Sequence, residues 1–152
     1  MSIKLLFSEH QEIWDDCYFG YIITDNICNN IGQVAIKEYL DKSEVFNFYP
    51  WLKHPEEIIY PVNGLKELNR IEFGSLFLHM AREAIAYGSS QRLSEQRLEA
   101  LLDSFLEGFT GPKYFSNFTV SSWSPVTTNS KDSFLCAADK SKIGMWLSCN
   151  NE

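Results

Sequence analysis

Residues 133–148, SFLCAADKSKIGMWLS, carry the clearest structural pattern in this sequence and lie near the carboxyl end of the chain. Two runs within it, SFLCAAD (133–139) and KIGMWLS (142–148), have the composition of strands. The polar residues Asp139, Lys140 and Ser141 lie between them. Two such runs joined by a short polar turn are typical of a β-hairpin. The sequence therefore predicts a C-terminal antiparallel hairpin.

Upstream of this hairpin the pattern changes from strand to helix. The run YFSNFTV (114–120) has strand composition, and residues 121–132 form a polar loop. Apolar residues recur at helical spacing over 98–106, and Ser94 is well placed to cap that helix. The longest helical pattern covers 65–87. Two helices are therefore predicted before the C-terminal strands.

The first 64 residues are predicted to be mainly helical. Ser8 begins one helical pattern, and apolar spacing predicts another helix from Asn26 to Asp41. The run YFGYIITDNI between them is ambiguous, because glycine and β-branched residues weaken a helix. Residues 46–64 contain three prolines and form a structured connector.

These elements predict one α+β domain over residues 1–152. Its N-terminal two-thirds are helical and pack with a small C-terminal antiparallel sheet, since strands are confined to one end of the chain. A chain of 152 residues is one domain by size, and 45% hydrophobic residues are enough to form a core.

Negative charge gathers in the first part of the chain. The net charge is −7, and residues 1–60 carry ten acidic side chains against four lysines. Contacts to phosphate need Lys and Arg, so direct nucleic-acid binding is not expected. A basic protein partner fits this charge, although acidity is more often a matter of solubility.

The sequence has no motif for metal, cofactor or phosphate binding. The four cysteines, Cys17, Cys28, Cys136 and Cys149, form no C-x-x-C pair, and no glycine-rich phosphate loop occurs. We therefore expect no metal and no cofactor. The start of the chain lacks a signal peptide, and no apolar run is long enough to span a membrane. The expected compartment is the cytoplasm.

One enzymatic alternative stays open. His79 and Glu83 are four residues apart in the longest helical pattern, as a base and its orienting group would be. Cys17 or Cys136 would have to supply a nucleophile. A hydrogen-bonded pair on a helix face explains the same spacing more simply, so we expect the protein not to be an enzyme. A constitutive adaptor is the other alternative.

Three segments together resemble the immunity proteins of bacterial contact-dependent growth inhibition, of the type that neutralises nuclease toxins. They are SEHQEIWDDCYFGYIITDNI (8–27), FNFYPWLKHPEEI (46–58) and FLCAADKSKIGMWL (134–147). The resemblance implies a cytoplasmic protein that binds the C-terminal domain of a cognate toxin and blocks its active site. Some members of this group extend a β-sheet jointly with the toxin.

Ten residues are our candidates for partner binding. The acidic candidates would complement a basic toxin surface, the aromatic ones would act as anchors, and the hairpin would pair through its backbone. The acidic set is Asp15, Asp16, Asp25, Glu56 and Glu57, the anchors are Tyr18, Tyr49 and Trp123, and Phe134 and Trp146 mark the hairpin.

Overall fold

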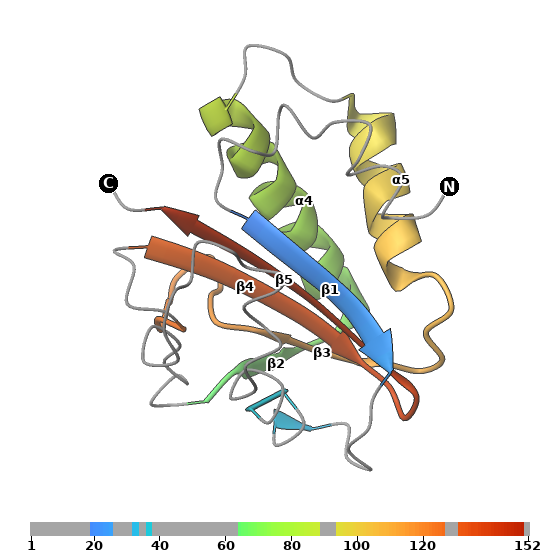
Figure 1. Cartoon of the computed structure of the whole chain (residues 1–152). Helices are drawn as coiled ribbons and strands as arrows, with labels where there is room; N and C mark the ends of the chain where they lie inside the picture. Colours follow the sequence, from blue (N-terminus) through green and yellow to red (C-terminus); the bar gives the residue numbers. More distant parts are fainter. Residues whose placement is uncertain are drawn as a thin grey trace.

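The computed structural model describes residues 19–25, 32–33, 36–37, 64–88, 94–126 and 131–150. These residues form five strands and two helices (Figure 1). In chain order they are β1 (Phe19–Asp25), β2 (Lys66–Leu68), α4 (Arg70–Gly88), α5 (Glu95–Leu106), β3 (Lys113–Ser116), β4 (Lys131–Ala138) and β5 (Lys142–Asn150).

The strands form one antiparallel sheet in the order β1-β5-β4-β3-β2. The predicted C-terminal hairpin is confirmed as β4 and β5, which pair from Lys131 opposite Asn150 to Ala138 opposite Ile143. The hairpin occupies the centre of the sheet. The edge strands among the described residues are β1 and β2.

The predicted fold class, a helical N-terminal two-thirds packed with a small C-terminal sheet, is wrong. The sheet is about as prominent as the helices, and two of its strands lie in the region predicted to be helical. β1 comes from the ambiguous run, where β-branched Ile22, Ile23 and Thr24 favour an extended backbone. The other predicted N-terminal helices lie outside the described residues, except for single positions near 32–37.

Local hydrogen bonds explain where the two helices begin. The helix predicted over 65–87 starts only at Arg70, because Asn69 and Glu72 form a capping box. The Asn69 Oδ1 accepts from the Glu72 N–H at 2.8 Å, and the Glu72 carboxylate accepts from the Asn69 N–H at 3.0 Å. The predicted Ser94 cap is confirmed, since its hydroxyl accepts from the Arg97 N–H at 3.3 Å.

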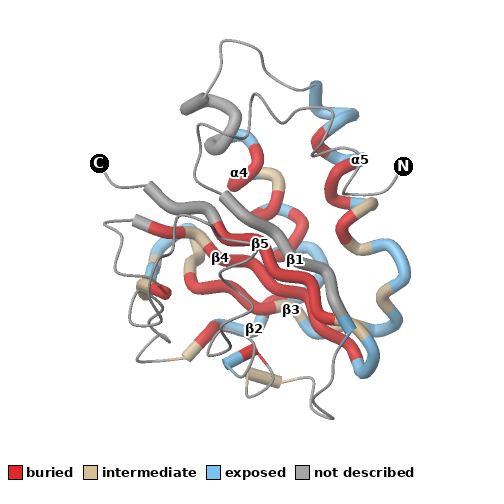
Figure 2. The backbone as a smooth tube through the Cα atoms, in the orientation of Figure 1, coloured by how far each residue is buried: buried red, intermediate tan, exposed pale blue. Residues whose placement is uncertain are grey.

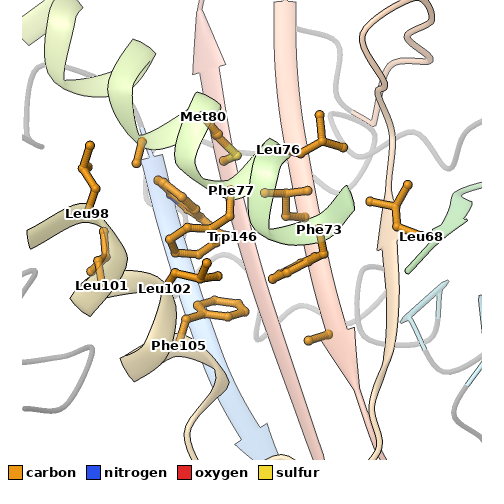
Figure 3. Close-up of a cluster of buried hydrophobic side chains, with 13 residues drawn as sticks. Leu68, Phe73, Leu76, Phe77, Met80, Leu98, Leu101, Leu102, Phe105 and Trp146 are labelled. Carbon is orange, nitrogen blue, oxygen red and sulfur yellow. The ribbon is translucent and has the colours of Figure 1, made fainter. Parts of the chain in front are cut away.

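Both helices pack on one face of the sheet through an aromatic cluster (Figure 3). The Phe77 ring lies 4.8 Å from the Trp146 ring of β5 and 5.3 Å from the Phe105 ring of α5, measured between centroids. Phe73 contacts Tyr114 of β3 in the same way at 4.8 Å. Aromatic contacts at these spacings stabilise a core beyond the area that they bury.

The central strands are buried on both faces (Figure 2). Leu135 and Ala137 of β4 belong to the cluster beneath the helices. Alternate residues of a strand point to opposite faces, so Phe134 and Cys136 lie on the other face, and both are fully buried. Burial on both faces explains why the hairpin sequence is nearly continuous in apolar residues rather than alternating.

Neither of the helices in the described part of the chain is long and apolar enough to cross a membrane.

The aromatic cluster predicts a large effect of truncating Phe77. We expect Phe77→Ala to lower the free energy of unfolding by about 3–5 kcal/mol, because a buried ring is replaced by a cavity. Ile71→Ala on the same helix is the control, since Ile71 is 82% exposed and should change stability by less than about 0.5 kcal/mol. Urea denaturation measures both. Equal effects of the two substitutions would contradict this packing.

Candidate protein-binding surface

The structure describes four of the ten candidate residues. Asp25 and Trp123 are exposed, whereas Phe134 and Trp146 are fully buried. The remaining candidates lie outside the described residues; they are Asp15, Asp16, Tyr18, Tyr49, Glu56 and Glu57.

The hairpin does not offer the open edge that the sequence suggested. β4 is paired with β3 as well as with β5, and β5 is paired with β1 as well as with β4. Trp146 lies opposite Leu135 on one side and Tyr21 on the other. The side chains of Phe134 and Trp146 are therefore buried, and the strands that carry them are paired on both sides, so neither residue can contact a partner. The sequence could not show that β1 would cover the outer side of β5.

Trp123 belongs to a loop, residues 117–126, that displays two apolar side chains. Val120 is 99% exposed and Trp123 is 45% exposed. A β-bridge joins Phe118 to Trp123, and the Thr119 N–H donates to the Ser122 carbonyl at 2.8 Å. The Thr119 and Ser122 hydroxyls are also 2.8 Å apart. The tip that carries Val120 is therefore a closed, hydrogen-bonded turn.

Hydrogen bonds connect the 117–126 loop to neighbouring strands of the sheet. The Lys66 ammonium of β2 donates to the Ser122 hydroxyl at 2.8 Å. The Ser116 hydroxyl, buried at the end of β3, donates to the Phe118 carbonyl at 2.8 Å. These bonds connect the tip of the loop to two strands.

Beneath the loop lies a buried pair of polar side chains, Asn117 and Asp132. The Asn117 amide nitrogen donates to the Asp132 carboxylate at 2.7 Å and to the Ser124 carbonyl at 3.0 Å. The Asn117 amide oxygen accepts from the Phe134 N–H at 2.7 Å. The Val126 N–H donates to the Asp132 carboxylate at 3.2 Å. Buried polar groups satisfied in this way fix one arrangement of the backbone.

The same network orients Trp123. Its indole N–H donates to the Asp132 carbonyl at 2.7 Å, while nearly half of the side chain stays exposed. An aromatic residue held in one orientation loses little conformational entropy when a partner covers it. The 117–126 loop is thus suited to insert apolar groups into a pocket of another protein.

Of the residues that build this loop, Trp123 is among the candidates predicted from the sequence, whereas Val120, Asn117 and Asp132 are not. The sequence predicts a strand over 114–120 and a polar loop over 121–132. β3 ends at Ser116, so the assignment of 117–120 to a strand is wrong, whereas 121–126 form the predicted loop. β4 begins at Lys131, inside the predicted loop, and residues 127–130 lie outside the described part. An apolar valine next to a polar run is the sequence feature that could have pointed to Val120 as an exposed binding residue. The bonding of Asn117 to Asp132 depends on the pairing of β3 with β4, which the sequence alone does not show.

Two groups of the enzymatic alternative, His79 and Cys136, have described side chains, and these two lie apart. His79 is exposed on α4, whereas Cys136 is buried on the face of the sheet away from the helices. Burial raises the pKa of the Cys136 thiol well above its ordinary value, so it is a poor nucleophile. Cys17 and the side chain of Glu83 lie outside the described part. Within that part, no three metal-binding side chains lie together.

A second buried carboxylate, Asp139, fixes the turn of the hairpin. Its oxygens accept from the N–H groups of Ser141 at 2.8 Å, Lys142 at 2.7 Å and Thr110 at 2.8 Å. Burial by itself raises the pKa of Asp139, but these hydrogen bonds and one from the Ser141 hydroxyl outweigh it and hold the pKa below its ordinary value. Asp139 therefore joins the hairpin to the segment that follows α5.

No family model, no curated protein and no solved structure matches this chain.

Removing the Asn117 amide should loosen the 117–126 loop. We expect Asn117→Ala to lower the free energy of unfolding by about 1–3 kcal/mol, because the buried Phe134 N–H loses its acceptor. Ser121→Ala is the matched control, since Ser121 is exposed in the same loop. Chemical denaturation compares the two variants, and an Asn117→Ala protein as stable as the control would show that the network is dispensable.

The lowered pKa of Asp139 predicts a pH-dependent contribution to stability. Ionised Asp139 stabilises the fold above its unfolded pKa of about 3.9, and this stabilisation is lost as the pH falls through the lower folded pKa. The difference in unfolding free energy between the natural protein and Asp139→Asn should be positive at neutral pH and shrink in acid. Thermal unfolding at a series of pH values measures it, with exposed Asp103→Asn as control. A difference that stays constant with pH would contradict this role.

Proposed function

We propose that the protein is an immunity protein, which binds the C-terminal domain of a cognate toxin and blocks its active site. The observation that carries the proposal is the 117–126 loop, which holds Val120 and Trp123 at the surface on a hydrogen-bonded frame. Tryptophan is the residue type most enriched at binding hot spots, and a preformed loop costs little entropy to bind.

The charge of the chain supports a basic partner. A net charge of −7 favours encounter with the basic surface that a nuclease uses to bind nucleic acid. Such a complex should form more slowly as salt is added. Asp25, exposed at the end of β1, is the described member of the acidic set that would contribute to this attraction. The proposed place of action is the cytoplasm, where a delivered nuclease would meet its substrate.

The direct experiment tests the protein against the C-terminal domain of the polypeptide encoded immediately upstream. We expect a one-to-one complex that abolishes a nuclease activity of that domain. Trp123→Ala should weaken the complex by about 30-fold or more, the effect expected of a hot spot. Val120→Asp should weaken it by at least about tenfold, because a carboxylate would be buried in an apolar pocket. Titration calorimetry measures both.

Ile71→Asp is the matched control for Val120→Asp. Both positions are exposed apolar residues, but Ile71 lies on α4 rather than in the 117–126 loop. The control should bind as the natural protein does. Absence of any complex would contradict the immunity proposal. A complex that is indifferent to both loop substitutions would place the interface elsewhere. Capture of a housekeeping protein instead would favour the adaptor alternative.

A further inference from the structure

A carboxamide side chain binds the backbone just before β2. The Gln33 Nε2 donates to the Leu65 carbonyl at 2.7 Å, and the Leu65 N–H donates to the Gln33 Oε1 at 2.8 Å. One planar amide thus satisfies both backbone groups of a residue that is 32 positions further along the chain. The backbone of an adjacent strand offers the same two kinds of group, one donor and one acceptor. Gln33 therefore takes the place of a neighbouring strand beside Leu65.

Gly64 leaves room for this carboxamide. Its φ is +72°, and a Cβ on residue 64 would lie 2.6 Å from the Gln33 Oε1. A larger residue would therefore both strain the backbone and displace the amide. The contact is also partly shielded from water, since Leu65 is buried and Gln33 is half-buried. Losing either bond would leave a shielded backbone group without its partner.

The backbone groups of Leu65 face away from β3. The Asn117 N–H donates to the Phe134 carbonyl of β4 at 3.3 Å. Backbone groups of successive strand residues point in opposite directions, so those of Ser116 face β2. Lys66 is the partner of Ser116 in the register, so its own backbone groups face β3. Those of Leu65, one residue earlier, point to the outer side, where the carboxamide meets them.

Lys66 links this contact to the 117–126 loop. It directly follows the residue that Gln33 binds, and its ammonium donates to the Ser122 hydroxyl oxygen at 2.8 Å. An ammonium can only donate, which leaves the Ser122 hydrogen free to bond the Thr119 hydroxyl oxygen 2.8 Å away. The Thr119 N–H donates in turn to the Ser122 carbonyl at 2.8 Å. The bonds across the tip of the loop thus continue from Lys66.

We infer that Gln33 is a positioning residue of the 117–126 loop. Its carboxamide holds Leu65 as a neighbouring strand would, and this contact fixes the adjacent Lys66, whose ammonium holds the tip of the loop. The loop that presents Trp123 is therefore set in place by a residue from the first part of the chain. The inference rests on the proposed function only for the use of this loop in binding.

Amide exchange in the free protein tests this role, because it reports local opening of hydrogen bonds. Gln33→Met keeps the length of the side chain but removes its donor and its acceptor. We expect exchange at Leu65 to become about tenfold faster, as the loss of a hydrogen bond predicts. Exchange at Thr119, which the effect reaches through Lys66, should become about threefold faster. Faster exchange at Leu65 with no change at Thr119 would overturn the inference.

Gln33→Glu adds a pH profile that a general loss of stability would not produce. A protonated carboxyl has one O–H donor and one carbonyl acceptor, the same pair that the carboxamide offers. An ionised carboxyl has no donor and repels the Leu65 carbonyl, which raises its pKa above the ordinary value of about 4.3. The contact is therefore complete below that value and is lost as the pH rises through the higher folded pKa.

The readout is the exchange rate at Thr119 relative to that of the natural protein at the same pH. For Gln33→Glu this ratio should be near one at about pH 4 and rise to about threefold near pH 7. For Gln33→Met it should be raised equally at both pH values, since methionine does not titrate. A ratio for Gln33→Glu that is the same at both pH values would contradict the role of the carboxamide.

Lys66→Met tests the link itself and spares the Gln33 contact, because the Lys66 side chain is exposed. Exchange should rise at Thr119 and stay unchanged at Leu65. Adding Gln33→Met to this variant should then change Thr119 no further, because both substitutions act through the same bond. Lys113→Met, which removes an ammonium from neighbouring β3, is the matched control. Additive effects at Thr119 would overturn the inference.

All of these measurements use the free protein, so they are independent of the toxin experiment. A protein that binds no toxin domain can still show the coupling between Gln33 and Thr119. Absence of this coupling leaves toxin binding through Trp123 and Val120 as it was proposed. The failure of one is therefore distinguishable from the failure of the other.

Discussion

The pairing of β4 with β5 at the centre of the sheet holds the other elements in place. β4 and β5 are hydrogen-bonded to strands on both sides, and their central residues are buried on both faces of the sheet. Such a pair cannot itself meet a partner, because neither its backbone nor its apolar side chains reach the surface. Recognition must therefore take place at the outer strands, at the helices or in the loops. Among the described residues, the 117–126 loop is where two exposed apolar side chains, Val120 and Trp123, lie close together in the sequence.

Two buried carboxylates lie at the two ends of β4. Each accepts hydrogen bonds from the segment that adjoins its end of the strand. Asp132, near the start of the strand, binds Asn117 and the Val126 N–H and so fixes the preceding loop. Asp139, just after its end, binds the hairpin turn and Thr110. Burying a carboxylate is costly unless hydrogen bonds compensate it, and in both places backbone N–H groups do so. Through the bonds of Asp132, the loop that carries Trp123 is held in place by the core strand β4.

The sequence predicted the elements that depend on local pattern. The hairpin, the strand at β3, the helix capped by Ser94 and most of the longest helix follow from periodicity, turn residues and caps. The sequence did not predict the elements whose conformation depends on pairing with a distant strand. β1 has a sequence compatible with either helix or strand, and only its partner β5 settles the choice. The same limit applies to the site: Trp123 was identifiable as an aromatic residue in a polar loop, whereas the burial of Phe134 and Trp146 follows from the neighbours that their strands acquire.

In the proposed function, the 117–126 loop makes the contact with another protein while the hairpin stays in the inaccessible core. Hydrogen exchange of backbone amides is the measurement to make, in the free protein and with the C-terminal domain of the polypeptide encoded immediately upstream added. Amides of β4 and β5 should exchange slowest in both states, and the added domain should slow exchange at Phe118, Thr119, Val120 and Trp123. Fast exchange in the hairpin of the free protein, or protection confined to residues outside the loop, would contradict the claim.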